Sequence, residues 1–267
     1  MTISSEDSIL LAGKVAIVTG SGRENGMGSG IALALARAGA RVVINHVSEA
    51  STTRAATVAS SIESEVGEGK VAVVRADIST AEGVQALVKK TLQSLNVDHI
   101  DIIINNAVYY EPGRLFGNPP EEITKVFQVS VVGPLLLLEA AYPHMSQNGR
   151  IINIGTVASK IGFYQKPIYA AAKAAMDQLT FSLAREIGRE GKNITINTLA
   201  PGLVATHKSE PVPGYQTIKN HLLDMTRVED RVGTMDDVTG AVLFLASEKS
   251  RWITGQYISV SGGITGG

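Results

Sequence analysis

The chain has 267 residues, of which 44% are hydrophobic and 18% are charged. This balance supplies a buried core and excludes a largely disordered chain. The 24 basic and 25 acidic residues nearly cancel, and the longest basic run is the pair Lys89 and Lys90. Neither nucleic acid nor a membrane surface is therefore expected as a partner. Cysteine is absent, which excludes thiol nucleophiles, disulfides and cysteine-ligated metals.

The sequence contains no targeting or metal-binding pattern. The segment before the first predicted strand has an acidic start and a short apolar run, unlike a signal peptide. The apolar run at 131–138 is too short to span a bilayer, and the five histidines have no metal-ligand spacing. We therefore expect a cytoplasmic protein with no metal site and no membrane partner.

Short runs rich in Val and Ile alternate with helix-length amphipathic segments along the whole chain. Strands are predicted at 14–20, 41–45, 70–75, 100–105, 150–154, 193–197 and 256–260, and helices at 31–38, 51–66, 79–95, 121–145, 168–188 and 236–246. Because the strands are continuous apolar runs, both sheet faces must be covered, as in parallel strands joined by crossover helices. The prediction is α/β: a single domain over 1–267, with a Rossmann-like doubly wound parallel sheet of about seven strands and helices on both faces.

Two segments stand outside this alternation. Residues 1–12 are expected to form an N-terminal arm. Residues 203–227, rich in Pro, Gly and His, follow a strand near the carboxyl edge of the predicted sheet. Long loops in that position commonly cover a substrate, so this segment is expected to be a substrate lid.

A glycine-rich turn, TGSGRENGMG at 19–28, follows the first strand and precedes a helix. Glycines there leave backbone N–H groups open to a phosphate, and the helix N-terminus adds partial positive charge. This arrangement predicts dinucleotide binding. The second strand ends at Asn45, without the carboxylate that would hold the ribose hydroxyls of NAD. Arg23 is instead available to a 2′-phosphate, so NADP(H) is favoured over NAD(H).

Tyr169 and Lys173 are separated by three alanines in a predicted helix, so their side chains share one helix face. A phenol with its reference pKa of about 10 is a poor base near neutrality, and a nearby ammonium lowers that pKa. At about 4 Å the attraction is worth ~1 kcal/mol in water but ~4 kcal/mol in partly buried surroundings. A partly buried pair would therefore suit acid–base chemistry. Thr156, just past a strand, adds a hydroxyl that can donate to a substrate carbonyl.

Together these residues resemble the short-chain dehydrogenase/reductase family, and the resemblance extends over nearly the whole chain. The matching pieces, in the family's order, are Thr19-Gly20, Gly26-Met27-Gly28, Asp77-Ile78, Asn105-Asn106-Ala107, Thr156, Tyr169, Lys173, Pro201-Gly202, Thr206, Gly255-Gln256 and Ser261-Gly262-Gly263.

The resemblance implies an NADP(H)-dependent oxidoreductase that interconverts a carbonyl compound and a secondary alcohol by hydride transfer. Tyr169 would be the proton donor and acceptor, Lys173 would lower its pKa and hold the nicotinamide ribose, and Thr156 would orient the substrate oxygen. A homo-oligomer, either a tetramer or a dimer, is implied as well. The residues implied to contact the dinucleotide are Gly20, Ser21, Arg23, Gly26, Met27, Gly28, Asp77, Ile78, Asn106, Tyr169, Lys173, Val204 and Thr206.

The sequence departs from the family at a fourth catalytic position. Where the family has asparagine in Val-Asn-x-x-Gly, this chain has Ser130 between Val129 and Gly133. Serine can hydrogen-bond, but it is shorter and lacks the separate donor and acceptor of an amide, so we expect Ser130 to serve as a weaker catalytic group. Two alternatives stay open: a dinucleotide-binding regulator without redox turnover, and a non-redox enzyme on the same scaffold.

Overall fold

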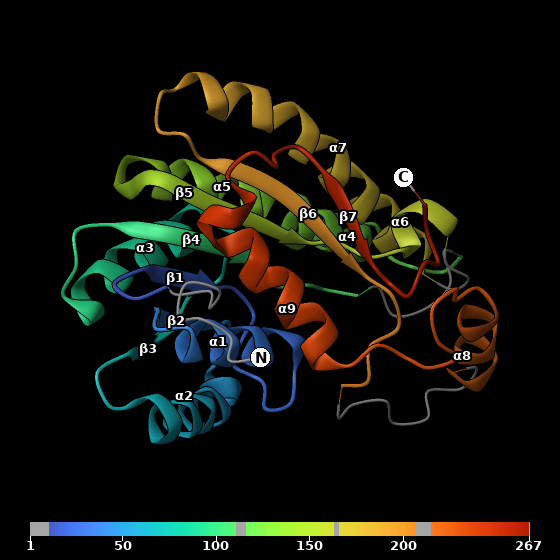
Figure 1. Cartoon of the computed structure of the whole chain (residues 1–267), viewed down its shortest axis with the longest axis horizontal. Helices are drawn as coiled ribbons and strands as arrows, with labels where there is room; N and C mark the ends of the chain where they lie inside the picture. The colour runs from blue at the N-terminus through green and yellow to red at the C-terminus, as the bar shows by residue number, and fades with distance from the viewer. Residues whose placement is uncertain (1–10, 111–115, 163–165, 207–214, 267) are drawn as a thin grey trace, which may run out of the picture.

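The computed structural model describes residues 11–110, 116–162, 166–206 and 215–266. Its centre is one parallel sheet with the strand order β3-β2-β1-β4-β5-β6-β7 (Figure 1). The strands are β1 (Val15–Val18), β2 (Arg41–His46), β3 (Val71–Arg75), β4 (Ile100–Asn105), β5 (Met145–Ile154), β6 (Thr195–Pro201) and β7 (Tyr257–Val260). The order runs outward in both directions from β1 and β4, which confirms the predicted doubly wound sheet.

Helices cover both faces of the sheet, as predicted (Figure 1). One face packs against α1 (Met27–Arg37), α2 (Thr52–Val66) and α9 (Met235–Ala246), and the other against α3 (Ala81–Leu95), α5 (Gly133–Ala141) and α7 (Pro167–Arg189). The side chains of β1 alternate between the two cores: Ala16 and Val18 face the first, Val15 and Ile17 the second. Every residue of β1 is buried, which explains its uninterrupted apolar sequence.

The predicted helix over 121–145 is divided in the structure. It consists of α4 (Pro120–Phe127), a π-helical turn (Gln128–Val132), α5 and a short 3-10 turn (Tyr142–His144), and Met145 already belongs to β5. The π turn has one extra residue per turn and changes which side chains face inward. Periodicity alone did not reveal this change.

The run Pro120–His144 is long and apolar enough, by length and composition, to cross a membrane. It is nevertheless interrupted by the π turn, and it contributes Val126 and Leu137, both fully buried, to hydrophobic clusters shared with α7 and α3. Its apolar sequence is thus accounted for in part by packing within the fold.

The segment predicted as a lid contains a helix, α8 (Tyr215–Asp224), so the prediction of a long loop without secondary structure was wrong for that part. In Figure 1, α8 stands beside the sheet near its carboxyl edge. Leu222 of α8 packs with Val157 and Ile264 in a small separate hydrophobic cluster. This apolar contact holds the helix. Residues 207–214 of the lid and 1–10 of the arm lie outside the described residues.

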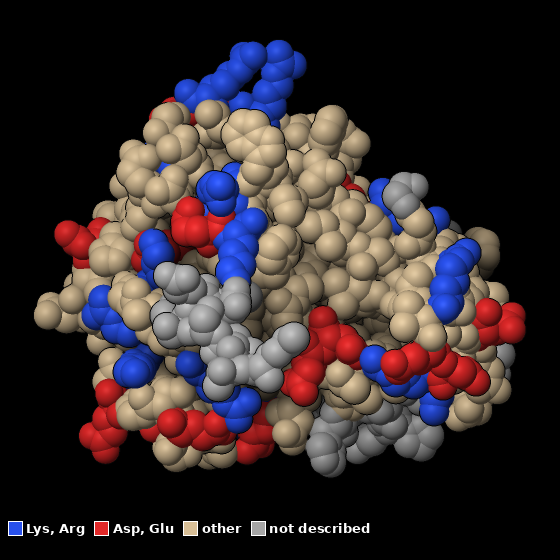
Figure 2. Space-filling model, viewed as in Figure 1, with Lys and Arg blue, Asp and Glu red and all other residues tan. Residues whose placement is uncertain are grey.

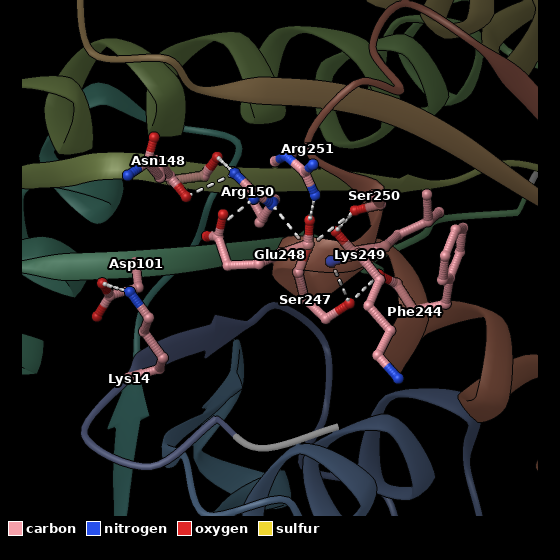
Figure 3. Close-up of polar contacts among 12 residues, drawn as sticks. Lys14, Asp101, Asn148, Arg150, Phe244, Ser247, Glu248, Lys249, Ser250 and Arg251 are labelled. Carbon is pink, nitrogen blue, oxygen red and sulfur yellow. Dashed lines mark hydrogen bonds and ion pairs between the residues drawn. The ribbon is translucent and has the colours of Figure 1, made fainter. Parts of the chain in front are cut away.

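A buried arginine on β5 ties this strand to the segment after α9 (Figure 3). The Arg150 guanidinium, only 2% exposed, donates to the carbonyl oxygens of Asn148, Gly149 and Ser247 and pairs with Glu248 at 3.0 Å. These bonds tie β5 to the segment that follows α9. Such contacts satisfy the buried charge of Arg150.

Candidate functional site

The predicted site residues gather at the carboxyl edge of the sheet. The glycine turn follows β1, Asp77 follows β3, Asn106 follows β4 and Thr156 follows β5. β1 and β4 are neighbours in the sheet although other strands separate them in the chain. In open α/β sheets this point of reversal is where ligands bind.

The glycine turn lies directly against the end of β4. Thr19 Oγ1 accepts hydrogen bonds from the backbone N–H groups of Asn106 and Ala107, both at 3.0 Å, and the Asn106 amide donates to the Thr19 carbonyl at 2.9 Å. Gly20 has a φ of +64°, and a Cβ there would lie 2.7 Å from the Ala107 Cα. A Cβ at Gly28 would lie 2.5 Å from the Asn106 amide nitrogen. Both positions therefore require glycine.

Ser21 and Asn45 fix the base of the turn. The Ser21 hydroxyl donates to the Val18 carbonyl at 2.7 Å and accepts from the Asn45 N–H at 3.1 Å. The Asn45 amide oxygen accepts from the Gly20 N–H at 3.2 Å, and its NH₂ donates to the Ala76 carbonyl at 3.1 Å. These bonds engage both ends of the amide. Asn45 is thus a structural link between the turn, β2 and β3, a role that sequence reasoning missed.

Gly26 caps α1, which then begins at Met27. The Ser29 hydroxyl accepts from the Gly26 N–H at 3.1 Å, and the first helical turn contains no acidic residue. Arg23 is exposed, and its carbonyl accepts from the Gly26 N–H. The positive end of the helix and one guanidinium therefore lie at the same turn, and this combination fits the phosphates of a dinucleotide.

The remaining predicted cofactor residues follow other strands of the same sheet, Asp77 and Ile78 after β3 and Val204 and Thr206 after β6. Asp77 accepts hydrogen bonds from the backbone and hydroxyl of Ser79, at 2.9 and 2.7 Å. Ile78 is buried. Val204 forms an isolated parallel bridge with Gly233, and its carbonyl accepts from the Thr206 N–H.

Tyr169 and Lys173 lie on one face of α7. The Lys173 ammonium is 6.0 Å from the centre of the Tyr169 ring and donates to the Ile154 carbonyl at 2.6 Å. Lys173 is only 4% exposed, and burial lowers its pKa to about 8, although the nearby Asp177 carboxylate opposes the shift. Tyr169 is half-buried. The structure therefore places the buried Lys173 ammonium near the ring of the half-buried Tyr169.

Thr156 and Ser130 approach α7 from different elements. Thr156 follows Ile154 at the end of β5, and its hydroxyl accepts from the Ala158 N–H at 3.2 Å. Ser130 lies in the π turn, 2% exposed, and its hydroxyl has no hydrogen-bond partner among the described residues. A buried hydroxyl without a partner is uncommon and costs stability.

Two further residues adjoin this group. The Tyr110 ring lies 4.8 Å from the Tyr169 ring, centre to centre and tilted by 48°, and Tyr110 remains 51% exposed. Asp177 is one turn beyond Lys173 on α7 and is buried. Asp177 continues the four-residue spacing of Tyr169 and Lys173 along the helix, and this spacing is a signal that could have identified it.

Comparison with known proteins identifies the family. A family model described as enoyl-(acyl carrier protein) reductase matches residues 20–265. The chain is 37% identical to tetrahydroxynaphthalene reductase PfmaG of Pestalotiopsis fici, with coverage of 97% of this chain and 94% of that protein. It is 34% identical to the short-chain dehydrogenase/reductase FrzI of a Cladobotryum species, with 95% and 96% covered.

A solved structure extends this agreement to the fold. The angucycline C-6 ketoreductase LanV with bound NADP superimposes with a TM-score of 0.84 at 29% identity, covering 95% of this chain and 96% of that one. Matches of this extent run through the glycine turn, the strand ends and α7 alike. The chain belongs to the short-chain dehydrogenase/reductase family.

Proposed function

We propose that this protein is an NADP(H)-dependent oxidoreductase that interconverts a carbonyl compound and a secondary alcohol. The observation that carries the proposal is the pairing of a half-buried Tyr169 with the buried Lys173 ammonium at the sheet edge where the glycine turn lies. Acid–base chemistry and dinucleotide binding would thus share one location. Relatives named tetrahydroxynaphthalene reductase and angucycline C-6 ketoreductase support the same reaction class.

The glycine turn and α1 are suited to hold the dinucleotide. Met27 and Gly28, in the first turn of α1, would present backbone N–H groups to its phosphates, with Arg23 toward a 2′-phosphate. Gly20, Ser21 and Gly26, whose N–H groups bond within the protein, would shape the turn against the cofactor. Flanking positions for the rest of the cofactor are Asp77, Ile78, Asn106, Val204, Thr206, Tyr169 and Lys173. LanV contains bound NADP, which supports NADP(H) over NAD(H). When bound, the nicotinamide would supply or accept the hydride.

The chain's own residues would manage the proton and the substrate oxygen. In the direction of reduction, the Tyr169 hydroxyl gives its proton to the carbonyl oxygen as that oxygen gains negative charge. The Lys173 ammonium stabilises the phenolate that remains. The Thr156 hydroxyl accepts from Ala158, so its own hydrogen is available to the substrate oxygen. Ser130, buried in the π turn that packs against α7, would supply a further hydroxyl.

The substrate is proposed to be a flat, ring-containing ketone. Tyr110 exposes half of its surface beside the proposed proton donor, and an aromatic ring there favours stacking with another ring. The Lys166 ammonium lies 5.9 Å from the Tyr110 ring centre. The names tetrahydroxynaphthalene reductase and angucycline ketoreductase, which belong to relatives, agree with this substrate class.

A homo-oligomer, either a dimer or a tetramer, is proposed on the basis of exposed apolar surface. Trp252 and Phe181 are 97% and 64% exposed, and β7 is an edge strand without charged residues. Figure 2 shows a broad area without charged side chains over β6 and β7. Exposed apolar surface of this kind is typical of protein–protein contacts. The cytoplasmic location stays a prediction.

The proposal is tested with Tyr169→Phe. This variant keeps the ring and removes the exchangeable proton, so we expect NADPH to bind with nearly unchanged affinity while reduction of polycyclic ketones falls at least a thousandfold, roughly the contribution of acid catalysis. Binding is measured by fluorescence titration and turnover by loss of reduced-nicotinamide absorbance. Full turnover in the variant would refute the role of Tyr169. Tight NADPH binding by the unaltered protein, without reduction of any carbonyl compound, would favour the regulator instead.

A further inference from the structure

Asp177 is a buried carboxylate that the proposed chemistry does not use. Its side chain is 5% exposed and lies in the middle of α7, one helical turn beyond Lys173. A carboxylate is rarely buried without a partner of opposite charge. The groups that surround Asp177 therefore indicate why this position holds an acid.

The two oxygens of the carboxylate differ in their contacts. Oδ2 accepts a 2.6 Å hydrogen bond from the Ser159 hydroxyl and lies 3.9 Å from the Lys160 ammonium. Oδ1 is buried and has no hydrogen-bond partner among the described residues. A Cβ added to Gly155 would lie 3.4 Å from Oδ1. This second oxygen thus faces the segment at which β5 ends.

The contacts of Asp177 lead to two of the proposed catalytic groups. Ser159 also contacts the Thr156 carbonyl at 2.9 Å, so the carboxylate holds the turn that carries Thr156. Lys173 donates to the carbonyl of Ile154, immediately before Gly155. The turn after β5 is therefore fixed from α7 at both ends.

The titratable groups around Asp177 come from three elements. Lys173 lies on α7 itself, Lys160 on α6 (Ala158–Ile161) and the uncharged Tyr257 phenol on β7. Lys160 is half exposed, whereas Lys173 is buried. Burial raises the pKa of the Asp177 carboxyl, and the Ser159 hydrogen bond and the two ammonium groups oppose that shift. Its carboxylate in turn opposes the effect of burial on the pKa of Lys173.

We propose that Asp177 is a positioning residue for the acid–base pair. Its carboxylate keeps the buried Lys173 ammonium charged in the working pH range, and through Ser159 it fixes the turn that presents Thr156. This inference rests on the proposed function, because Lys173 has to be charged only if it supports Tyr169. It adds a third residue to the series at 169, 173 and 177, which shares one face of α7.

The test measures the ionisation of Lys173 without cofactor or substrate. The free energy of unfolding is determined with urea between about pH 6 and about pH 10 for proteins with Lys173 and with Lys173→Met, in the unaltered and Asp177→Asn backgrounds. Within each background, the difference between the two free energies of unfolding, followed against pH, reports the ionisation of Lys173. In the unaltered background this difference changes slope near pH 8, where Lys173 loses its proton. In Asp177→Asn we expect the change about one pH unit lower, the typical effect of one nearby opposite charge.

Ser159→Ala is the matched control, because it removes the hydrogen bond and retains the carboxylate. It should leave the change of slope near its original pH while lowering turnover through Thr156. A change of slope that stays in place in Asp177→Asn, or that moves equally in Ser159→Ala, would overturn the electrostatic role. If Asp177→Asn does not fold, Asp177→Ser removes the charge and leaves room for water.

Turnover gives the second readout. The alkaline limb of kcat/KM for ketone reduction should move about one pH unit lower in Asp177→Asn, and Asp177→Glu should restore much of it. The two hypotheses fail differently. Failure of the proposed function appears as turnover by Tyr169→Phe, whereas failure of this inference appears as an unmoved Lys173 ionisation in a protein whose Tyr169→Phe variant is inactive.

Discussion

The Lys173 ammonium donates a 2.6 Å hydrogen bond to the carbonyl oxygen of Ile154, inside the protein and at the end of β5. The bond fixes the position of the ammonium at the end of β5, and it joins α7 to this strand, which precedes Thr156. One charge-assisted hydrogen bond satisfies only part of a buried ammonium. The position therefore costs the fold stability, which is typical of groups retained for chemistry.

Lys173→Met should make the protein more stable and inactive. The pKa of Lys173 is lowered from 10.5 to about 8, so charging it in the folded state costs on the order of 3 kcal/mol at neutral pH. We expect a gain of about 1–2 kcal/mol in the free energy of unfolding, because the Ile154 carbonyl loses its donor. The gain should persist below about pH 8 and shrink as the pH rises toward 10.5, the ordinary lysine pKa. It should become a loss once Lys173 is neutral in both states, because the missing donor to the Ile154 carbonyl then remains as the difference. Lys90→Met, on the exposed face of α3, is the control. A loss of stability at neutral pH would contradict the prediction.

Ser130→Ala tests the unpartnered hydroxyl in the π turn. Removing a buried hydroxyl that has no hydrogen-bond partner among the described residues should raise the free energy of unfolding by about 1 kcal/mol. Turnover should fall about tenfold if the hydroxyl assists the proton step, with little change in the affinity for NADPH. Urea unfolding and steady-state kinetics measure the two effects. Ser130→Thr, which keeps a hydroxyl, should retain more activity, and equal activity of both variants would argue against a catalytic role.

The order of strands and helices could be predicted from the sequence, because the spacing of apolar residues and the positions of glycines are local signals. The runs around Val15 and Ile100 are buried on both faces and read directly as parallel strands. The division of the helix at the π turn was not visible, since Gln128 and Val132 fit an ordinary helical pattern. α8 was missed because the stretch containing it mixes helical and turn-forming residues.

The site was predictable where chemistry depends on spacing. Tyr169 and Lys173 face one side of α7 because four residues make about one helical turn. Tertiary contacts explain what was missed. Asn45 binds the turn after β1 across the sheet, and Asp177 meets Ser159 from another helix. Tyr110 meets Tyr169 only once β4 and α7 are brought together.

Arg23→Ala should reduce the preference for NADPH over NADH. If Arg23 pairs with the 2′-phosphate, its loss removes a charge-assisted hydrogen bond worth about 1.5–3 kcal/mol. NADPH should then bind roughly tenfold to a hundredfold more weakly, while the affinity for NADH stays nearly constant. Dissociation constants are measured by fluorescence titration at fixed ionic strength, because phosphate contacts are screened by salt.

Arg189→Ala is the control for a change of net charge, since Arg189 is exposed at the far end of α7. It should leave both affinities unchanged. Equal affinity of the unaltered protein for the two cofactors would contradict the preference for NADP(H). A parallel loss of NADPH and NADH binding in Arg23→Ala would mean that Arg23 supports the turn itself, whose Gly26 N–H bonds to the Arg23 carbonyl.

Tyr110→Ala should change which ketones are reduced. The Tyr110 ring lies tilted against the Tyr169 ring, and about half of Tyr110 remains exposed, at 51%. An aromatic pair contributes about 0.5–1.5 kcal/mol beyond the area that it buries, so kcat/KM for a polycyclic ketone should fall about threefold to tenfold or more. For a small acyclic ketone, which makes no ring contact, it should change little. Tyr110→Phe keeps the ring and should behave like the unaltered protein with both substrates. If Tyr110→Ala lowered kcat/KM equally for both ketones, the ring would act by supporting Tyr169, and the proposed substrate class would lose its structural basis.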